Sequence, residues 1–404
     1  MTANRYAHRV NDIQPFRVVE VLSRAKALEA QGRDIVHMQA GEPDFATAQP
    51  VVDAGIAALQ NGATHYSDAS GLWELRQAIA DYYRSDYGVD VDPRRIMVTP
   101  GASGALLLLS ALLIDPGENL LMADPGYPCN RNFMRIMEGE GLLVPVNADD
   151  NFQLHAELVE RHWQPGDTSI GKTVGALVAT PANPTGTMLD KAELSQLFDA
   201  VEQRGGHLLV DEIYHGLDFR DAQGQRTAHS ILEITDQAFV INSFSKYFGM
   251  TGWRLGWLVA PEWAVPLLEK LAQNVFISMS TMGQYAAIEC FAPATREILD
   301  QRREEFKRRC DVLLPALREL GFIIPKPPAG GLYIYADISR FLGRFGSDSQ
   351  AFCLQMLERH GLAMTPGTDF GYHHCDKYVR FAFTTSTERL LVAIERMQAI
   401  FSRR

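Results

Sequence analysis

Cysteine is scarce in this sequence and shows no spacing typical of a cross-link or a metal site. Five cysteines occur among 404 residues: Cys129, Cys290, Cys310, Cys353 and Cys375. Their number is odd and none are spaced as C-x-x-C, so neither a disulfide framework nor a zinc site is indicated. We therefore expect no metal centre, and a reducing cytoplasm fits this cysteine usage best.

Long apolar runs and an excess of positive charge are also missing. The apolar run 105–114 is much shorter than the roughly 20 residues of a membrane-spanning helix. Residues 1–30 alternate charged and apolar side chains and lack the apolar core of a signal peptide. The formal net charge of −11 argues against nucleic acid or an anionic membrane as the main partner. We expect a soluble protein that binds neither.

The most informative stretch of the chain is Ser243–Trp257, which follows an apolar run typical of a buried strand. Ser243, Ser245 and Arg254 supply two hydroxyls and a guanidinium, which together suit a phosphate dianion. Lys246 lies among apolar neighbours. Since burial lowers the pKa of a lysine, it is a candidate for a Schiff base with a carbonyl compound.

A lone lysine is usually a solvated surface charge. Beside a phosphate clamp, however, Lys246 indicates pyridoxal 5′-phosphate (PLP) as the cofactor. A glycine-rich turn after the predicted strand 96–99 adds to this interpretation. Gly101, Ala102 and Ser103 begin an apolar helix there, and free amide groups at the positive end of a helix favour a phosphate.

Four further polar residues follow predicted strands and suit the ring of such a cofactor. Tyr127 can stack on a flat aromatic ring, and the amide of Asn183 can donate to a phenolate oxygen. Asp211 ends a buried strand and needs a positive partner, such as a pyridinium nitrogen, to stay ionised. Tyr214 can donate to the same ring oxygen as Asn183.

The order of predicted elements indicates an α/β architecture with ligands at the carboxyl ends of the strands. Residues 295–320 alternate charged and apolar side chains, as in a long amphipathic helix that bridges two domains. Residues 378–383 alternate as a half-buried strand. Arg380 lies within that strand and needs an anionic partner if it points inward.

These motifs occur in the order found in class I/II aminotransferases, PLP enzymes of fold type I, and the resemblance covers nearly the whole chain. They are S-x-S-K with G-x-R in 243–257, G-x-P-D-F at 41–45, Y-x-x-x-x-G-x-x-x-L-R from Tyr66, N-P-T-G from Asn183, D-E-x-Y from Asp211 and the strand bearing Arg380. The resemblance implies a three-layer PLP-dependent transferase fold with a mostly parallel central sheet and a smaller split α+β domain. It implies an amino-terminal arm and part of the small domain in 1–46, a PLP-binding domain in 47–292 and the rest of the small domain in 293–404.

The resemblance also implies roles that the residues alone do not give. The backbone at Gly41 touches the substrate carboxylate, and Asn183 contacts the cofactor's ring hydroxyl beside the substrate. Arg380 grips the α-carboxylate of the amino acid. Tyr66 reaches the cofactor phosphate of the partner subunit, so the resemblance predicts a homodimer with shared active sites.

We expect a ping-pong aminotransferase that moves an amino group between an L-amino acid and a 2-oxo acid such as 2-oxoglutarate. Lys246, Asp211 and Tyr214 are the expected catalytic residues. An aspartate-type aminotransferase and a PLP-dependent β-lyase remain alternatives, since both share these cofactor contacts. A regulator on this fold usually bears a DNA-binding domain, and no such segment is evident before Ile13. A purely structural protein has no need of Lys246, Asp211 and Arg380 together.

The preferred donor is expected to be neutral, hydrophobic or aromatic. Ser103 fills a position that carries lysine in some acid-specific relatives, and residues 274–285 contain no arginine or lysine. The expected lining is apolar or aromatic: Phe16, Tyr127, Phe276 and Ile277. The alternative is that Arg131 or Arg135 swings in to bind an acidic side chain.

Overall fold

A computed structural model describes residues 6–166 and 171–401. Its main element is a seven-stranded sheet in the order β2-β8-β7-β6-β5-β3-β4, in which only β8 runs antiparallel to its neighbours. The strands are β2 (Ile96–Thr99), β3 (Asn119–Asp124), β4 (Glu140–Pro145), β5 (Thr173–Ala179), β6 (His207–Asp211), β7 (Phe239–Ser243) and β8 (Gly256–Val259). The predicted mostly parallel sheet is confirmed.

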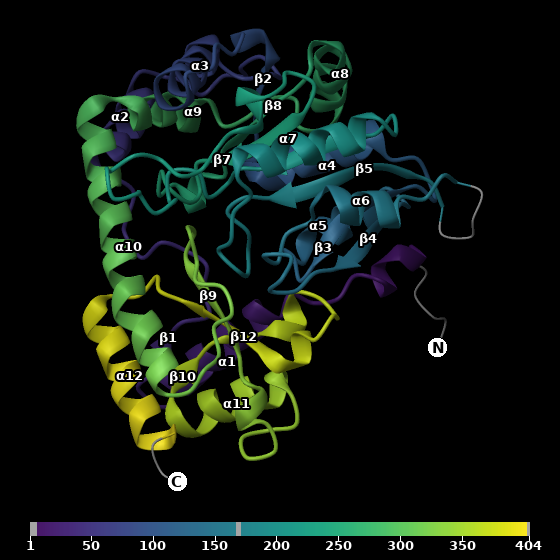
Figure 1. Cartoon of the computed structure of the whole chain (residues 1–404). Coiled ribbons are helices and arrows are strands. Elements are labelled where there is room, and N and C mark those ends of the chain that lie inside the picture. The colour runs from purple at the N-terminus through teal and green to yellow at the C-terminus, as the bar shows by residue number, and fades with distance from the viewer. Residues whose placement is uncertain (1–5, 167–170, 402–404) are drawn as a thin grey trace, which may run out of the picture.

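Both faces of this sheet are covered, which gives three layers (Figure 1). One face packs on α4 (Gly101–Leu113), α5 (Cys129–Ile136) and α8 (Val265–Val275). The other packs on α3 (Trp73–Tyr87), α6 (Ala156–His162) and α7 (Lys191–Glu202), while α2 (Gln49–Gln60) lies against α9 (Thr281–Ile288). Because each central strand is buried on both faces, its sequence is a continuous apolar run and not an alternating one.

A smaller region lies below the large sheet in Figure 1. Its antiparallel sheet has the order β11-β12-β9, and β1 pairs in parallel with β10 beside it. The elements are α1 (Arg17–Glu29), β1 (Val36–His37), β9 (Tyr333–Asp337), α11 (Ser349–His360), β10 (Leu362–Ala363), β11 (Thr365–Pro366), β12 (Tyr378–Ala382) and α12 (Thr387–Phe401). Since β1 comes from the amino-terminal segment and β10 from the carboxyl-terminal one, this region is assembled from both ends of the chain.

The long helix α10 (Pro293–Glu319) joins the two regions and runs along one side of the molecule, from beside α2 to beside α12 (Figure 1). At 1.5 Å per residue it is about 40 Å long. The predicted helix over 295–320 is thus confirmed. The domain boundaries at residues 46 and 292 stay predictions. The first predicted domain includes residues 1–5 and the last includes residues 402–404, which lie outside the described part of the chain.

The predicted half-buried character of residues 378–383 is wrong. Residues 379–382 are all buried, because β12 is the middle strand of its sheet and is covered on both faces. On one face, Phe381 packs edge-on against Phe322 at a centroid distance of 5.4 Å. On the other face, Arg380 reaches across to Asn183 of the large region. The alternation of apolar and polar residues in β12 therefore separates an apolar buried face from a polar buried face.

Within the described residues, no helix combines the length and apolar character needed to cross a membrane.

Candidate active site

A cavity of about 440 Å³ opens where the carboxyl ends of the parallel strands face the small region. Every segment that bears a predicted catalytic, cofactor-binding or α-carboxylate-binding residue, except the one around Tyr66, contributes to its wall. The predicted residues that line it are Gly41, Ala102, Ser103, Tyr127, Asn183, Asp211, Tyr214, Ser243, Ser245, Lys246, Arg254 and Arg380. The fold thus brings together side chains from seven separate stretches of sequence.

The amine of Lys246 lies at the centre of these groups. Its Nζ donates a hydrogen bond to the carbonyl oxygen of Gly41 at 2.7 Å, and it lies 5.8 Å from the centroid of the Tyr214 ring. No carboxylate of the described residues pairs with it at ion-pair distance. Gly41 cannot be replaced without displacement, because a Cβ there would lie 1.9 Å from the phenol oxygen of Tyr333. The lysine therefore faces open cavity with only a carbonyl as its partner.

One end of the cavity is built for an anion. The hydroxyl of Ser243, the last residue of β7, donates to Oγ of Ser245 at 3.0 Å. Arg254 reaches the same end and donates from Nη1 to the carbonyl of Thr251 at 3.1 Å. Two hydroxyls and a guanidinium on one wall match the geometry of a phosphate.

The amino terminus of α4 closes this end from the other side. Ala102 and Ser103 line the cavity at the first turn of the helix, where amide groups lack partners within the helix. Gly101 does not line the cavity but lies behind it with φ +69°, and a Cβ there would lie 2.8 Å from Arg254 Nη2. Arg254 is itself left-handed, at φ 55°. Such backbone strain persists where the surroundings hold it, commonly at functional sites.

At the opposite end, Asp211 is a buried carboxylate that lacks a cation. It is 5% exposed, and its carboxylate accepts a hydrogen bond from the backbone N–H of Ile213 at 3.0 Å. No lysine, arginine or histidine of the described residues lies within ion-pair distance. Burial raises the pKa of Asp211 to about 7, although the Ile213 N–H and the charge of Lys246 lower it. A positively charged ligand group is what this carboxylate needs to remain ionised.

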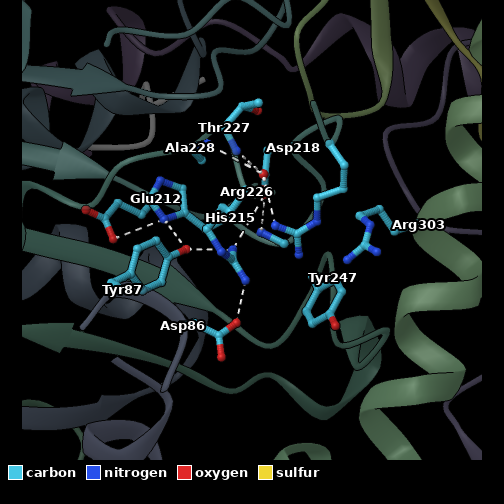
Figure 2. A network of polar contacts seen from close by, with 12 residues as sticks. Asp86, Tyr87, Glu212, His215, Asp218, Arg226, Thr227, Ala228, Tyr247 and Arg303 are labelled. Carbon is cyan, nitrogen blue, oxygen red and sulfur yellow. Dashed lines mark hydrogen bonds and ion pairs between the residues drawn. The ribbon is translucent and has the colours of Figure 1, made fainter. Parts of the chain in front are cut away.

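The residue that follows Asp211, Glu212, belongs to a buried polar network (Figure 2). Oε2 of Glu212 lies 3.4 Å from Nδ1 of His215. The same nitrogen is 2.8 Å from the hydroxyl of Tyr87. Arg226 donates to the same hydroxyl at 2.9 Å and pairs with Asp86. Burial raises the pKa of Glu212 to about 8 and lowers that of His215 to about 3. These contacts fix the backbone that follows β6 and hold the end of that strand in place.

Two phenols meet at the wall next to Lys246. The hydroxyl oxygens of Tyr214 and Tyr333 are 2.7 Å apart. Burial raises the pKa of Tyr214 well above its usual range, so the phenol keeps its proton and can donate. Sequence reasoning missed Tyr333 as a site residue. The signal was the pair of glycines just before it, Gly330 and Gly331, which brings the start of β9 close to the large region.

Arg380 is held in place by three hydrogen bonds but has no anionic partner. Its Nη1 donates to Asn183 Oδ1 at 2.9 Å, and its Nη2 donates to the carbonyl of Gln39 at 2.6 Å and to Thr365 Oγ1 at 3.2 Å. These three acceptors are neutral. Asn183 itself lines the cavity.

The Arg380 guanidinium lies between two rings, 4.2 Å from the centroid of Tyr333 and 4.8 Å from that of Phe370. Arg380 is 2% exposed, and its Nε is buried without a partner. No carboxylate among the described side chains lies within ion-pair distance of it, although the Asp369 carboxylate is near enough for its charge to interact with Arg380. A buried charge of this kind requires an anion to compensate its lost hydration, and the cavity is the side from which an anion can come.

Some predicted residues lie elsewhere. Tyr66 is 81% exposed and does not line the cavity of its own chain. Phe16 and Tyr127 do line it, with their rings edge to face at a centroid distance of 6.2 Å. Phe276 and Ile277, expected beside them, do not line it and directly follow α8, where Ile277 is exposed.

The two arginines considered for an acidic substrate also lie outside the cavity wall. Arg135 pairs with Asp12 at 2.6 Å, and the guanidinium of Arg131 lies 5.3 Å from the centroid of the Tyr372 ring. Val18 and Ile213 line the cavity although nothing in the sequence singled them out. Both are ordinary apolar residues within apolar patterns, so only the fold reveals their position.

Comparisons with known proteins agree with this geometry. The family model described as aminotransferase class I and II matches residues 33–397. A valine–pyruvate aminotransferase of Mycobacterium tuberculosis is 34% identical, with 95% of this chain and 96% of that protein covered. An aspartate aminotransferase of Thermotoga maritima is 30% identical, with 98% and 100% covered. A solved aminotransferase structure from Mycobacterium tuberculosis superposes with a TM-score of 0.92 at 34% identity and complete coverage of both chains. With its strands, its cavity and nearly its whole length in agreement, the chain belongs to the class I and II aminotransferases.

Proposed function

We propose that this aminotransferase uses PLP and moves amino groups between neutral, hydrophobic or aromatic L-amino acids and a 2-oxo acid such as 2-oxoglutarate. The choice of donor rests on one observation: every cation that lines the cavity already has another role. The lysine and arginines that line it are Lys246, Arg254 and Arg380. Each has a role in holding the cofactor or an α-carboxylate, so the described residues of the cavity wall offer no cation to a distal carboxylate.

The donor set fits PLP at each end of the cavity. Ser243, Ser245, Arg254 and the first amides of α4 would hold the phosphate, and Asp211 would pair with the pyridine nitrogen. Asn183 and Tyr214 would donate to the ring oxygen, and Tyr127 would cover the ring. The fit rests on Asp211 above all, since this buried carboxylate has no cation of its own within the described chain. Bound PLP supplies a protonated ring that accepts electrons from the α-carbon of the amino acid.

The protein's own groups divide the remaining work. Arg380 binds and orients the α-carboxylate, with the backbone of Gly41 beside it. Lys246 Nζ, held at 2.7 Å from the Gly41 carbonyl, takes the α-proton as a base and returns it as an acid. Tyr333 and Phe370 shield the guanidinium of Arg380 from water, which strengthens its interaction with an anion. The second 2-oxo acid uses the same groups in reverse.

The wall of the cavity also carries apolar side chains. Phe16, Val18, Leu106 and Ile213 line the cavity together with the ring of Tyr127. A distal carboxylate placed among them loses hydration without gaining a partner, at several kcal/mol. An aspartate-type enzyme is the competing candidate, because relatives such as the Thermotoga maritima protein bear that name.

We also propose a homodimer with shared sites. Large apolar side chains are exposed around the packed helices α2 and α9, namely Ile56, Leu59, Tyr66, Trp73 and Tyr285. An exposed apolar surface of this extent marks a contact between proteins. Tyr66 lies on it and is not part of the wall of its own cavity, as expected of a residue that serves the partner's site.

A single-turnover screen tests the donor. PLP-loaded protein is mixed with each amino acid in the absence of a 2-oxo acid, and the released oxo acid and the change in cofactor absorbance are followed. We expect methionine, leucine or phenylalanine to react with a higher kcat/KM than aspartate. A higher value for aspartate would show that a cation reaches the cavity from elsewhere. Turnover that continues without any added 2-oxo acid would identify a β-lyase instead.

A further inference from the structure

Helix α1 begins without a capping side chain of its own. The residue at its N-cap position is Phe16, which makes no side-chain hydrogen bond to the helix. The first N–H groups of a helix have no partner within it. Here the N–H of Arg17 donates to Asp369 Oδ1 at 3.1 Å, and that of Val18 donates to Asp369 Oδ2 at 3.3 Å. The cap therefore comes from a residue 352 positions later in the chain than Arg17.

The identity of the N-cap residue explains this arrangement. Ser, Thr, Asp and Asn are preferred at an N-cap because their side chains accept from the first N–H groups. In this chain that position is occupied by an aromatic residue that lines the cavity and contacts Tyr127 edge to face. Val18, two residues on, lines the cavity as well. Asp369 thus supplies the cap that Phe16 cannot.

Asp369 is built into the segment that also surrounds Arg380. It is 4% exposed and lies between Thr365, which accepts from Arg380, and Phe370, whose ring covers the guanidinium. One short stretch of chain therefore contacts the arginine with one set of groups and the start of α1 with another. The position of Phe16 relative to Arg380 is set through this stretch.

We propose that Asp369 is a positioning residue for the side-chain pocket: by capping α1 it holds Phe16 and Val18 over the cavity beside Arg380, and so favours large apolar donors. This inference rests on the proposed function. The rest of α1 has separate anchors, because Arg24 pairs with Glu358 and the buried Ala25 and Leu28 pack on the small region. Loss of the cap should therefore loosen the first turn of α1 and leave the helix in place.

The test compares a large and a small donor. We expect Asp369→Ala to lower kcat/KM for phenylalanine roughly fivefold to tenfold, the effect of a lost helix cap, mainly through KM. Alanine, which does not reach Phe16, should change less than twofold. Asp369→Asn keeps one oxygen acceptor and should recover part of the loss. Asp190→Ala is the matched control, since Asp190 caps α7 of the large region, does not line the cavity, and should leave the phenylalanine-to-alanine ratio unchanged.

A double-mutant cycle with Phe16→Ala separates positioning from general stability. If Asp369 acts through Phe16, its replacement has little further effect on phenylalanine once Phe16 is gone. Equal losses for both donors, or additive losses in the double variant, would overturn the proposal. If Asp369→Ala does not fold, Asp369→Asn decides by the same ratio. A wild-type protein that reacts with no amino acid refutes the proposed function, whereas an active wild type with an unchanged ratio refutes this inference alone.

Discussion

Replacing Asp211 by asparagine should stabilise the cofactor-free protein at neutral and alkaline pH. Burial raises the pKa of Asp211 from 3.8 to about 7. The folded protein therefore binds this proton more tightly than the unfolded chain does. The protonated Asp211 therefore contributes its full stabilisation below about pH 4, and this stabilisation is lost progressively as the pH rises through 7.

The size of the effect follows from the same values. Each unit of difference between the folded and unfolded pKa corresponds to 1.36 kcal/mol of stability. The shift of Asp211 from 3.8 to about 7 therefore means that the ionised carboxylate costs the apoprotein about 4 kcal/mol above pH 7. Asparagine at this position carries no charge and avoids that cost. PLP should offset it in the wild type, because a pyridinium nitrogen pairs with the carboxylate. PLP should thus stabilise the wild type more than Asp211→Asn.

Urea unfolding of both apoproteins between pH 4 and pH 8.5 measures this. The two should be equally stable near pH 4, and Asp211→Asn should become the more stable as the pH rises. Glu212, whose pKa burial raises to about 8, is present in both, so its effect largely cancels in the comparison. Replacement of the exposed Asp115 by asparagine is the control and should give no such trend. A variant no more stable than wild type at pH 8 would refute the account of Asp211 as a carboxylate that lacks a cation.

Three further predictions concern the other site residues. Lys246→Ala should lose nearly all amino transfer yet still bind PLP through Ser243, Ser245 and Arg254, as activity assays and equilibrium dialysis can show; near-normal transfer would remove Lys246 from the mechanism. Arg380→Met should lower kcat/KM for all amino acids by about 10²-fold, the effect of losing hydrogen bonds to a charged carboxylate, with no fall in apoprotein stability; a loss confined to acidic donors would place Arg380 at the side chain instead. Mixing Tyr66→Phe chains with Lys246→Ala chains should give hybrid dimers with one unmutated site, so activity above that of the parent homodimers is expected, and its absence would show that the sites are not shared.

Much of the site could be predicted because polar or small residues follow apolar runs at the carboxyl ends of strands. The strand Ile96–Thr99 has the bounds that its pattern predicted. Asp211 and Lys246 were recognisable for the same reason, since each ends or follows a buried strand. In a parallel sheet these ends meet at one edge, so local patterns were enough to indicate a common site.

Contacts between distant segments could not be predicted in this way. The hydrogen bond between Tyr214 and Tyr333 joins residues 119 positions apart, and Asp369 caps a helix at the other end of the chain. Neither pair leaves a periodic trace in the sequence, because each partner alone looks like an ordinary loop or strand residue. The burial of β12 on both faces was missed for a related reason. Its polar face packs against the large region, and alternation alone cannot tell a protein contact from solvent.

The most direct test of the central claim follows the amino nitrogen itself. The PLP-loaded protein is incubated with ¹⁵N-methionine and 2-oxoglutarate, and the products are identified by NMR and mass spectrometry. We predict that the label appears in glutamate, in an amount equal to the oxo acid formed from methionine, and that the Lys246→Ala variant does not transfer it. Release of the label as ammonia, independent of 2-oxoglutarate, would contradict the assignment of this cavity to amino transfer.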